Sequence, residues 1–319
     1  MTSNTQTEHW STDENDRATQ TVMVTGATGY VGNRLMPLLR RSGYTVKGLA
    51  RSPEKLNQTE LHEIEIRQGD VLDLASLKQA LKGIDTAFYL VHLMGGDGDF
   101  MERDRQAARN FIVAAEHCGV KRIIYLGGLG DVNDPDLSPH LRSRHEVGEI
   151  LRQGSVEVIE FRAAVLVGAG SLSFEMIRNL TDRLPVMICP RWLSTATQPI
   201  SIDDTLSYLV AALSLPTEGN RIIGIGGADV VTYGDMIREY ARQRGLKRTL
   251  IPVPLLSPWL SSLWLSLVTP ATAGVGRHLI EGLQNETTVR DPEPASRLPV
   301  KPIGMQEAIR IAIEEESGL

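Results

Sequence analysis

Short apolar runs alternate with amphipathic segments along the first half of the chain. The first run, TVMVT, precedes an amphipathic segment that starts at Tyr30 and ends near Gly43. Further apolar runs occupy residues 44–50, 63–68, 85–93, 121–128 and 156–168, and helical patterns occupy residues 74–81, 100–118 and 138–154. Strands and helices that alternate at this spacing form βαβ units. The sequence therefore predicts an α/β fold around a doubly wound parallel sheet.

The alternation becomes less regular after Gly168. Apolar and amphipathic stretches follow at 173–190, 203–213 and 231–245, and a proline-rich linker at 290–302 leads to a last helical pattern at 305–316. A chain of 319 residues exceeds the size at which one hydrophobic core usually keeps growing. We expect a nucleotide-binding domain over residues 21–168 and a smaller α/β substrate lobe over 169–319, interleaved with the first sheet.

A glycine-rich turn, VTGATGYVG, lies between the first strand and the first helix. Glycine permits a tight turn and a close approach of the backbone to a pyrophosphate, and it lets the helix pack closely on the strand. The free N–H groups at the helix N-terminus favour an anion. The pattern predicts a dinucleotide site formed by Gly26, Thr28, Gly29, Tyr30, Val31 and Gly32.

Composition excludes several other classes of function. The formal net charge of -6 argues against binding to nucleic acid, which requires clustered Lys and Arg. The two cysteines, Cys118 and Cys189, have neither metal-ligand spacing nor a disulfide pattern, so we expect no metal and a reducing, cytoplasmic location. Residues 1–20 are polar, lack the apolar run of a signal peptide and are predicted to be a disordered leader.

Residues 249–276 contain no charged side chain. Four prolines interrupt this segment, and the stretch between Pro258 and Pro270 is shorter than the about 20 residues that span a bilayer. We therefore expect a buried or oligomer-interface helix and a homodimer. Peripheral contact with a membrane is the alternative interpretation.

The glycine turn and several later stretches resemble the extended and atypical short-chain dehydrogenases/reductases. The similarity extends through GDVLD, GVKRIIYLGG, RAAVLVG and QPISIDD. More narrowly, YLVHLMGG, LSPHLRSRHEVGEIL and LPVMICPRW resemble a bacterial group of NmrA-like, NAD(P)H-binding proteins described as nucleoside-diphosphate-sugar epimerase-like. The resemblance implies a Rossmann fold, a nicotinamide cofactor and a small-molecule substrate.

The end of the second strand bears on the choice of cofactor. A carboxylate there would bind the ribose of NAD, but the chain has Arg51 and Ser52, with no acid before Glu54. A cation suits a 2′-phosphate, so NADP(H) is favoured over NAD(H), unless Arg51 is only a solvated loop residue. The resemblance also implies cofactor contacts at Asp70, Val71, Leu90, Val91, Ala163, Ala164 and Val165.

The catalytic residues of the resembled superfamily are absent from this chain. Its tyrosine and lysine positions fall on His140 and Arg144, and Gly127 and Gly128 stand near the position of its serine. His140 and His92 are candidate proton carriers at neutral pH, whereas Arg144 is suited only to anchoring ribose or phosphate. Tyr125 is a weaker candidate donor.

Other charged residues near these candidates allow more than one role. Arg142, Arg144 and Arg162 are a candidate basic pocket, and Glu102 and Asp104 are candidates to orient ligand hydroxyls or to pair with arginines. Two functions stay open at this point. One is an NADP(H)-dependent oxidoreductase of an unidentified small molecule, and the other is a non-catalytic NADP(H)-binding redox sensor or assembly protein.

Overall fold

The computed structural model describes residues 18–53, 64–93, 99–189, 191–252 and 282–318. Its central feature is a seven-stranded sheet in the order β11-β6-β5-β4-β1-β2-β3, in which every neighbouring pair is parallel. Its strands are β1 (Thr21–Thr25), β2 (Thr45–Ala50), β3 (Glu65–Gln68), β4 (Thr86–Tyr89), β5 (Arg122–Gly128), β6 (Glu157–Ala163) and β11 (Arg221–Ile225). The predicted doubly wound parallel sheet is confirmed. The strand order reverses between β1 and β4, and ligands of such sheets bind at this switch point, outside the carboxyl ends of the strands.

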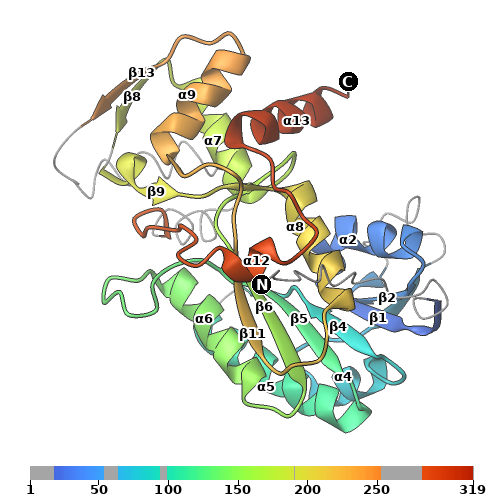
Figure 1. Ribbon diagram of the computed structural model, residues 1–319. Helices are drawn as coiled ribbons and strands as arrows, with labels where there is room; N and C mark the ends of the chain where they lie inside the picture. The colour runs from blue at the N-terminus through green and yellow to red at the C-terminus, as the bar shows by residue number, and fades with distance from the viewer. Residues whose placement is uncertain (1–17, 54–63, 94–98, 190, 253–281, 319) are drawn as a thin grey trace, which may run out of the picture.

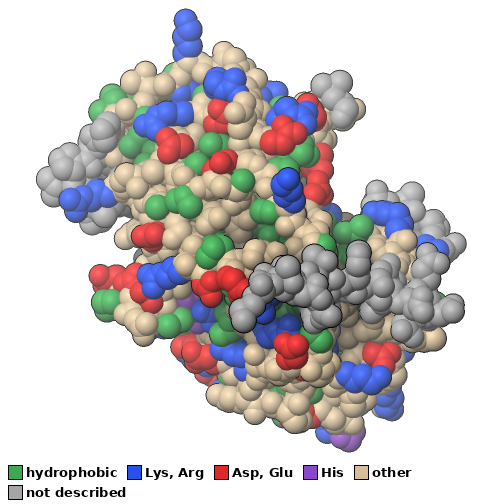
Figure 2. Space-filling view, in the orientation of Figure 1, with side chains coloured by type: hydrophobic (Ala, Val, Ile, Leu, Met, Phe, Trp, Pro, Cys, Tyr) green, Lys and Arg blue, Asp and Glu red, His purple; other side chains and the backbone are tan. Residues whose placement is uncertain are grey.

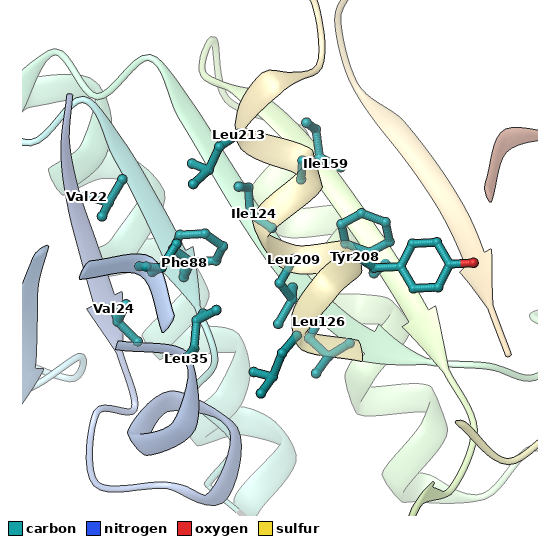
Figure 3. Close-up of a cluster of buried hydrophobic side chains, with 14 of the residues drawn as sticks. Val22, Val24, Leu35, Phe88, Ile124, Leu126, Ile159, Tyr208, Leu209 and Leu213 are labelled. Atoms are coloured by element: carbon teal, nitrogen blue, oxygen red, sulfur yellow. The ribbon is translucent and has the colours of Figure 1, made fainter. Parts of the chain in front are cut away.

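Two helical layers cover the sheet. Figure 1 shows α2 (Tyr30–Arg41) and α8 (Ile202–Ala211) on one face, and α4 (Leu74–Ala80), α5 (Phe100–Cys118) and α6 (Pro139–Arg152) on the other. Successive side chains of β1 pack on opposite faces of the sheet, because neighbouring side chains of a strand point in opposite directions. Val22 and Val24 pack with Leu35 and Leu209 in the first core, which Figure 3 shows, while Met23 belongs to the second core.

Local capping fixes the helices that carry the candidate site. The side chain of Asp99 accepts hydrogen bonds from the N–H groups of Met101 and Glu102 at the start of α5, and Gly119 ends this helix with a left-handed backbone. At the start of α6, the side chain of Ser138 accepts from the N–H of Leu141, and Pro139 follows in the first turn.

A second lobe lies beyond the carboxyl ends of the strands (Figure 1). Its main elements are α7 (Leu172–Arg183), β8 (Val186–Cys189), α9 (Tyr233–Gln243), β13 (Thr249–Pro252) and α13 (Met305–Ser317). Shorter ones are β7 (Leu166–Val167), η2 (Arg191–Ser194), β9 (Ala196–Thr197), β10 (Ile200–Ser201), η3 (Ala212–Ser214), β12 (Val231–Thr232) and α12 (Glu293–Ser296). A separate core that includes Phe174, Met236 and Ile309 holds the lobe together.

The structure differs from the predicted elements in three places. The strand expected over 156–168 breaks after Ala163, because β7 leaves the large sheet and pairs with β10. The strand expected over 85–93 ends at Tyr89, since the N–H of Leu90 donates to the hydroxyl of Thr25. Strand β11 was not predicted, and it brings the chain back to the first sheet beside β6.

The uncharged segment continues directly from an exposed apolar surface. Val186, Ile188 and Ile251 are 53%, 45% and 44% exposed, and Ile188 and Ile251 are register partners in the two-stranded sheet of β8 and β13. These three residues are called the β8–β13 face below. Residues 253–276 of the uncharged segment, and residues 1–17 of the expected leader, lie outside the described residues. No described helix combines the length and the apolar character that crossing a membrane requires.

Candidate active site

A cavity of about 280 Å³ opens at the switch point of the sheet, between the Rossmann layers and the lobe. The sheet side supplies the ends of β4, β5 and β6 and the start of α2 and α6. Among the predicted site residues, it is lined by Gly26, Gly29, Tyr30, Val31, Gly32, Leu90, His92, His140, Arg144, Ala163, Ala164 and Val165. The structure therefore brings twelve of the predicted site residues together around one cavity.

The glycine turn has a shape that larger residues cannot adopt. Gly26 has a φ of 66°, and a Cβ at this position would stand 2.9 Å from the carbonyl oxygen of Leu90. A Cβ on Gly32 would stand 2.3 Å from the carbonyl oxygen of Gly26, so α2 packs directly on the turn. The N–H of Gly29 closes the turn by donating to the carbonyl of Gly26 at 2.8 Å.

The start of α2 fits the pyrophosphate of a dinucleotide. Its N-cap residue, Gly29, makes no side-chain capping bond, and the first turn of the helix carries no acid. Helical N–H groups that lack such partners attract an anion. Tyr30, Val31 and Gly32 in this first turn line the cavity, whereas Thr28 is exposed and is not among the lining residues.

The remaining predicted cofactor residues lie outside this cavity. Arg51 and Ser52 follow β2, and Arg51 is exposed. The carboxylate of Asp70 accepts a hydrogen bond from the N–H of Leu72 at 2.9 Å. Val71 is buried in the core below α5, and the carbonyl of Val91 accepts from Arg144. These positions surround the sheet ends next to the glycine turn.

His92 and His140 come from different elements and meet at the cavity. His92 follows β4, and its Nδ1 lies 2.9 Å from Oδ2 of Asp104 on α5. Its Nε2 lies 2.9 Å from Nδ1 of His140 on α6. An ionised carboxylate only accepts hydrogen bonds, so Nδ1 of His92 carries the proton. In the neutral ring Nε2 of His92 then accepts from Nδ1 of His140.

Asp104 anchors this chain of imidazoles. Its carboxylate is 1% exposed and also accepts from the N–H of Leu93 at 2.9 Å and from the hydroxyl of Ser143 at 3.0 Å. Burial acts to raise the pKa of Asp104, but the hydrogen bond and charge of His92, the hydrogen bond from Leu93 and the charge of Arg144 together lower it. A carboxylate that stays ionised favours the protonated form of the histidine beside it. The geometry resembles the base-and-orienter arrangement of catalytic triads.

Arg144 is held against the ends of two strands. Its guanidinium donates to the carbonyl of Val91 at 3.2 Å and to the carbonyl of Leu126, and it lies 4.8 Å from the ring centre of Tyr125. Tyr125 is completely buried, and its hydroxyl donates to the backbone carbonyl of Arg144 at 2.8 Å. Burial raises the pKa of Tyr125 to about 12, which makes it a poor proton donor near neutral pH.

The prediction that Arg142, Arg144 and Arg162 form a basic pocket is wrong. Arg162 pairs with Glu160 at 2.6 Å and lines a different cavity, while Arg142 reaches only the backbone carbonyls of Pro135 and Leu137. Arg142 and Arg162 are therefore not among the described residues that line the cavity with Arg144. Glu102 pairs with Arg105 and Arg109 on α5 and is exposed.

Two parts of the site were not predicted from the sequence: the single residue Ser143 and a group of residues from the lobe. Ser143 follows His140 by one helical turn, a spacing that could have indicated its bond to Asp104. The second group closes the cavity from the lobe side and has no local signal, because its members come from four distant segments. This group is called the lobe wall below and consists of Leu166, Ser173, Tyr233, Gly282, Leu283 and Thr287.

Comparison with known proteins agrees with this geometry. Residues 26–168 match the model of a family described as NAD(P)H-binding. This part of the chain is similar to NAD(P)H-binding domains. The match starts at the first glycine of the turn and ends after β7, so the matched region contains the turn, both histidines and Arg144.

Proteins to which this chain is similar include reductases. It is 33% identical over 135 residues to cinnamoyl-CoA reductase 1 of Oryza sativa subsp. japonica, an alignment that covers 40% of each chain. The chain thus aligns with about two fifths of that relative's length. It is 26% identical over 264 residues to the ceramide reductase of Caulobacter vibrioides, covering 80% of this chain and 82% of the relative.

A solved structure shows the same fold over nearly the whole chain. The triphenylmethane reductase of a Citrobacter species has a TM-score of 0.71 at 19% identity, covering 92% of this chain and 99% of that one. The protein is reductase-like, and the predicted likeness to atypical short-chain dehydrogenases/reductases is confirmed. The narrower likeness to NmrA-like proteins and the preference for NADP(H) stay predictions.

Proposed function

We propose that the protein is an NADP(H)-dependent reductase of a small carbonyl or enone compound, in which His140 supplies the proton. The observation that carries this proposal is the chain from Asp104 through His92 to His140, which ends at the cavity beside the glycine turn. A histidine pair backed by a buried carboxylate has little use in a purely structural role at a strand end. Perturbed titratable groups in a cavity are instead typical of functional sites.

Chain residues around the cavity would hold the cofactor. The glycine turn and the first turn of α2 would bind the pyrophosphate, and Ala163, Ala164 and Val165 would lie beside the nicotinamide. Arg144 would lie beside the adjoining ribose or phosphate, because it lines the cavity between β4 and β5. When bound, the reduced nicotinamide supplies a hydride.

The histidines would complete the reduction by moving one proton. The substrate carbon gains the hydride while its carbonyl oxygen takes a proton from Nε2 of protonated His140. Neutral His140 then regains a proton at Nε2 from solvent. Asp104 holds the Nδ1 proton of His92, so that the unprotonated Nε2 of His92 accepts from Nδ1 of His140 and stabilises the positive charge of its protonated ring. A positioned acid of this kind contributes typically about 10²–10⁴-fold to the rate.

Arg51 supports the preference for NADP(H). It stands at the end of β2, where an acid would select NAD, and its exposed side chain is accessible to a 2′-phosphate. A charge-assisted hydrogen bond is worth about 1.5–3 kcal/mol, which corresponds to a preference of roughly 10- to 150-fold.

Fluorescence titration with NADPH and NADH tests this choice. The wild type should bind NADPH more tightly, and Arg51→Ala should lose most of the preference by weakening NADPH alone. Arg41→Ala removes an equally exposed arginine from the last turn of α2 and serves as the control. Equal affinities of the wild type for the two dinucleotides would refute the role of Arg51.

The second candidate function is a non-catalytic NADP(H) sensor. The absence of the serine, tyrosine and lysine at the superfamily positions favours it, as do the two strand-end carbonyls that already hold Arg144. A panel of aldehydes, ketones and enones separates the two functions. NADPH oxidation with any of them supports the reductase, whereas tight NADPH binding without turnover on the whole panel would establish the sensor.

A further inference from the structure

We infer that the substrate part of the cavity takes an uncharged, largely apolar carbonyl compound, and not a substrate carried on a diphosphate or coenzyme A. This inference rests on the proposed function, because it assigns a substrate class to the same site. The distinction matters because the two classes require opposite lobe walls. A diphosphate requires cations or free helix N-termini, whereas an apolar chain requires neither.

The lobe wall carries no charge. Its six described residues comprise two leucines, a glycine, a tyrosine, a serine and a threonine. Tyr233 is 3% exposed, and burial raises its pKa to about 12, so its phenol stays neutral. Leu283 and Thr287 are also buried, and the hydroxyl of Thr287 donates to that of Thr197 at 2.9 Å. The hydroxyls of Tyr233, Thr287 and Thr197 therefore hydrogen-bond with one another and need no charged ligand.

Two lobe helices start at the cavity, and each carries an acid in its first turn, although Ser171 at the start of α7 makes no side-chain capping bond. At the start of α9, the side chain of Asp235 accepts from the N–H of Thr232 at 3.0 Å, and the hydroxyl of Thr232 accepts from the N–H of Asp235. This capping box places a carboxylate where a phosphate would bind. The first turn of α7, next to Ser173 of the lobe wall, carries Glu175.

Two arginines of the described elements around the cavity are already bonded to other groups. Arg178 on α7 forms ion pairs with Glu175 and with Glu316 of α13. Arg144, the arginine among the described lining residues, donates to the carbonyls of Val91 and Leu126. It belongs to the sheet side, where the cofactor would use it. The described lobe side thus offers contact area but no counter-ion for a phosphate.

Matched ligands test the inference without requiring turnover. The protein loaded with NADPH is titrated calorimetrically with trans-2-decen-1-ol, which NADPH cannot reduce as a carbonyl, with trans-2-decenoyl-CoA and with UDP-glucose. We expect the alcohol to bind at least tenfold more tightly than either phosphate-bearing ligand, with an affinity that does not fall as salt rises. An equal or higher affinity for decenoyl-CoA or UDP-glucose would overturn the inference.

A variant of the lobe wall locates the binding site. Leu166→Asn keeps roughly the side-chain size but removes apolar contact with the ligand. A loss of roughly 50 Å² of buried apolar surface, at about 25 cal/mol per Å², corresponds to about tenfold weaker binding of the alcohol. Leu184→Asn, at a half-buried leucine of the lobe outside the cavity, is the control and should leave the affinity unchanged. Equal losses in both variants would overturn the assignment to the lobe wall.

The failure of the proposed function has a different signature. If trans-2-decen-1-ol binds and depends on Leu166, but no carbonyl compound oxidises NADPH, the reductase proposal fails while the apolar ligand class stands. If carbonyl compounds are reduced but decenoyl-CoA or UDP-glucose competes best for the site, the reductase stands and the ligand class is wrong.

Discussion

Replacing Asp104 with asparagine should disable the histidine pair while leaving the fold in place. The side chain is buried and accepts hydrogen bonds from His92, Ser143 and the N–H of Leu93. Asparagine can still accept from Leu93 through its oxygen, but its NH₂ group then faces His92. His92 would turn from donor to acceptor at Nδ1 and would carry its proton on Nε2, so that it could no longer accept from Nδ1 of His140 and support its protonated ring.

The rate should fall much more than the stability. Losing the charge that supports the imidazolium removes the advantage of a positioned acid, about 10²–10⁴-fold in kcat. The free energy of unfolding should fall by only about 1–3 kcal/mol, the typical cost of a lost charge-assisted hydrogen bond. Because a carboxylate raises the pKa of a neighbouring histidine, removing it should also move the descending limb of the pH–rate profile to lower pH.

The assay is NADPH oxidation on the best neutral acceptor, with the pH–rate profile and the NADPH affinity measured on the same preparations. Ser143→Ala is the matched control, since it removes one hydrogen bond to the same carboxylate without removing the charge. It should cost less than about tenfold in kcat, because the carboxylate and its hydrogen bond from His92 remain. An Asp104→Asn protein with a wild-type rate and an unshifted profile would refute the relay.

Three further predictions follow from particular contacts. Gly32→Ala should abolish NADPH binding and lower the free energy of unfolding by about 1–3 kcal/mol, because its Cβ would lie 2.3 Å from the carbonyl oxygen of Gly26. The control is Gly83→Ala, which lies in open space at a left-handed φ; it should destabilise the protein without changing its affinity for NADPH. Burial, aided by the charge of Arg162, lowers the pKa of His145 to about 4. The contribution of neutral His145 to the free energy of unfolding is therefore complete above the unfolded-state pKa and is lost as the pH falls from 6.5 to 4. By pH 5 the free energy of unfolding in urea should have fallen by about 2 kcal/mol. His145→Asn should flatten this part of the plot of unfolding free energy against pH, and an unchanged plot would contradict the lowered pKa of His145. For the β8–β13 face we propose a homodimer interface: sedimentation should show a dimer that Ile188→Lys converts to a monomer, and flotation of a monomeric wild type with liposomes would favour membrane contact instead.

Much of the Rossmann part could be predicted because its signals are local. The bounds expected for α5 agree with the structure, since Asp99 caps its start and Gly119 ends it within a residue or two of the apolar pattern. The glycine turn is equally local. Strand β11 could not be predicted as part of the first sheet, because its pairing with β6 depends on how the chain returns to the sheet after residues 164–220.

Figure 2 shows acidic and basic side chains interspersed over the visible face.

As with the fold, only part of the candidate site could be predicted. The histidines were found from strand-end and helix positions, but their direct contact and the burial of Asp104 depend on how α5 and α6 pack side by side. The lobe wall depends on tertiary structure alone.

The most direct test is a single-turnover measurement of NADPH oxidation in the wild type and in His140→Ala. We expect the wild type to reduce at least one neutral aldehyde, ketone or enone. If His140 supplies the proton, His140→Ala should slow this step at least about 100-fold, while the affinity for NADPH changes by less than about threefold. A His140→Ala protein that reduces the acceptor at the wild-type rate would contradict the account, as would a wild type that binds NADPH tightly and reduces nothing.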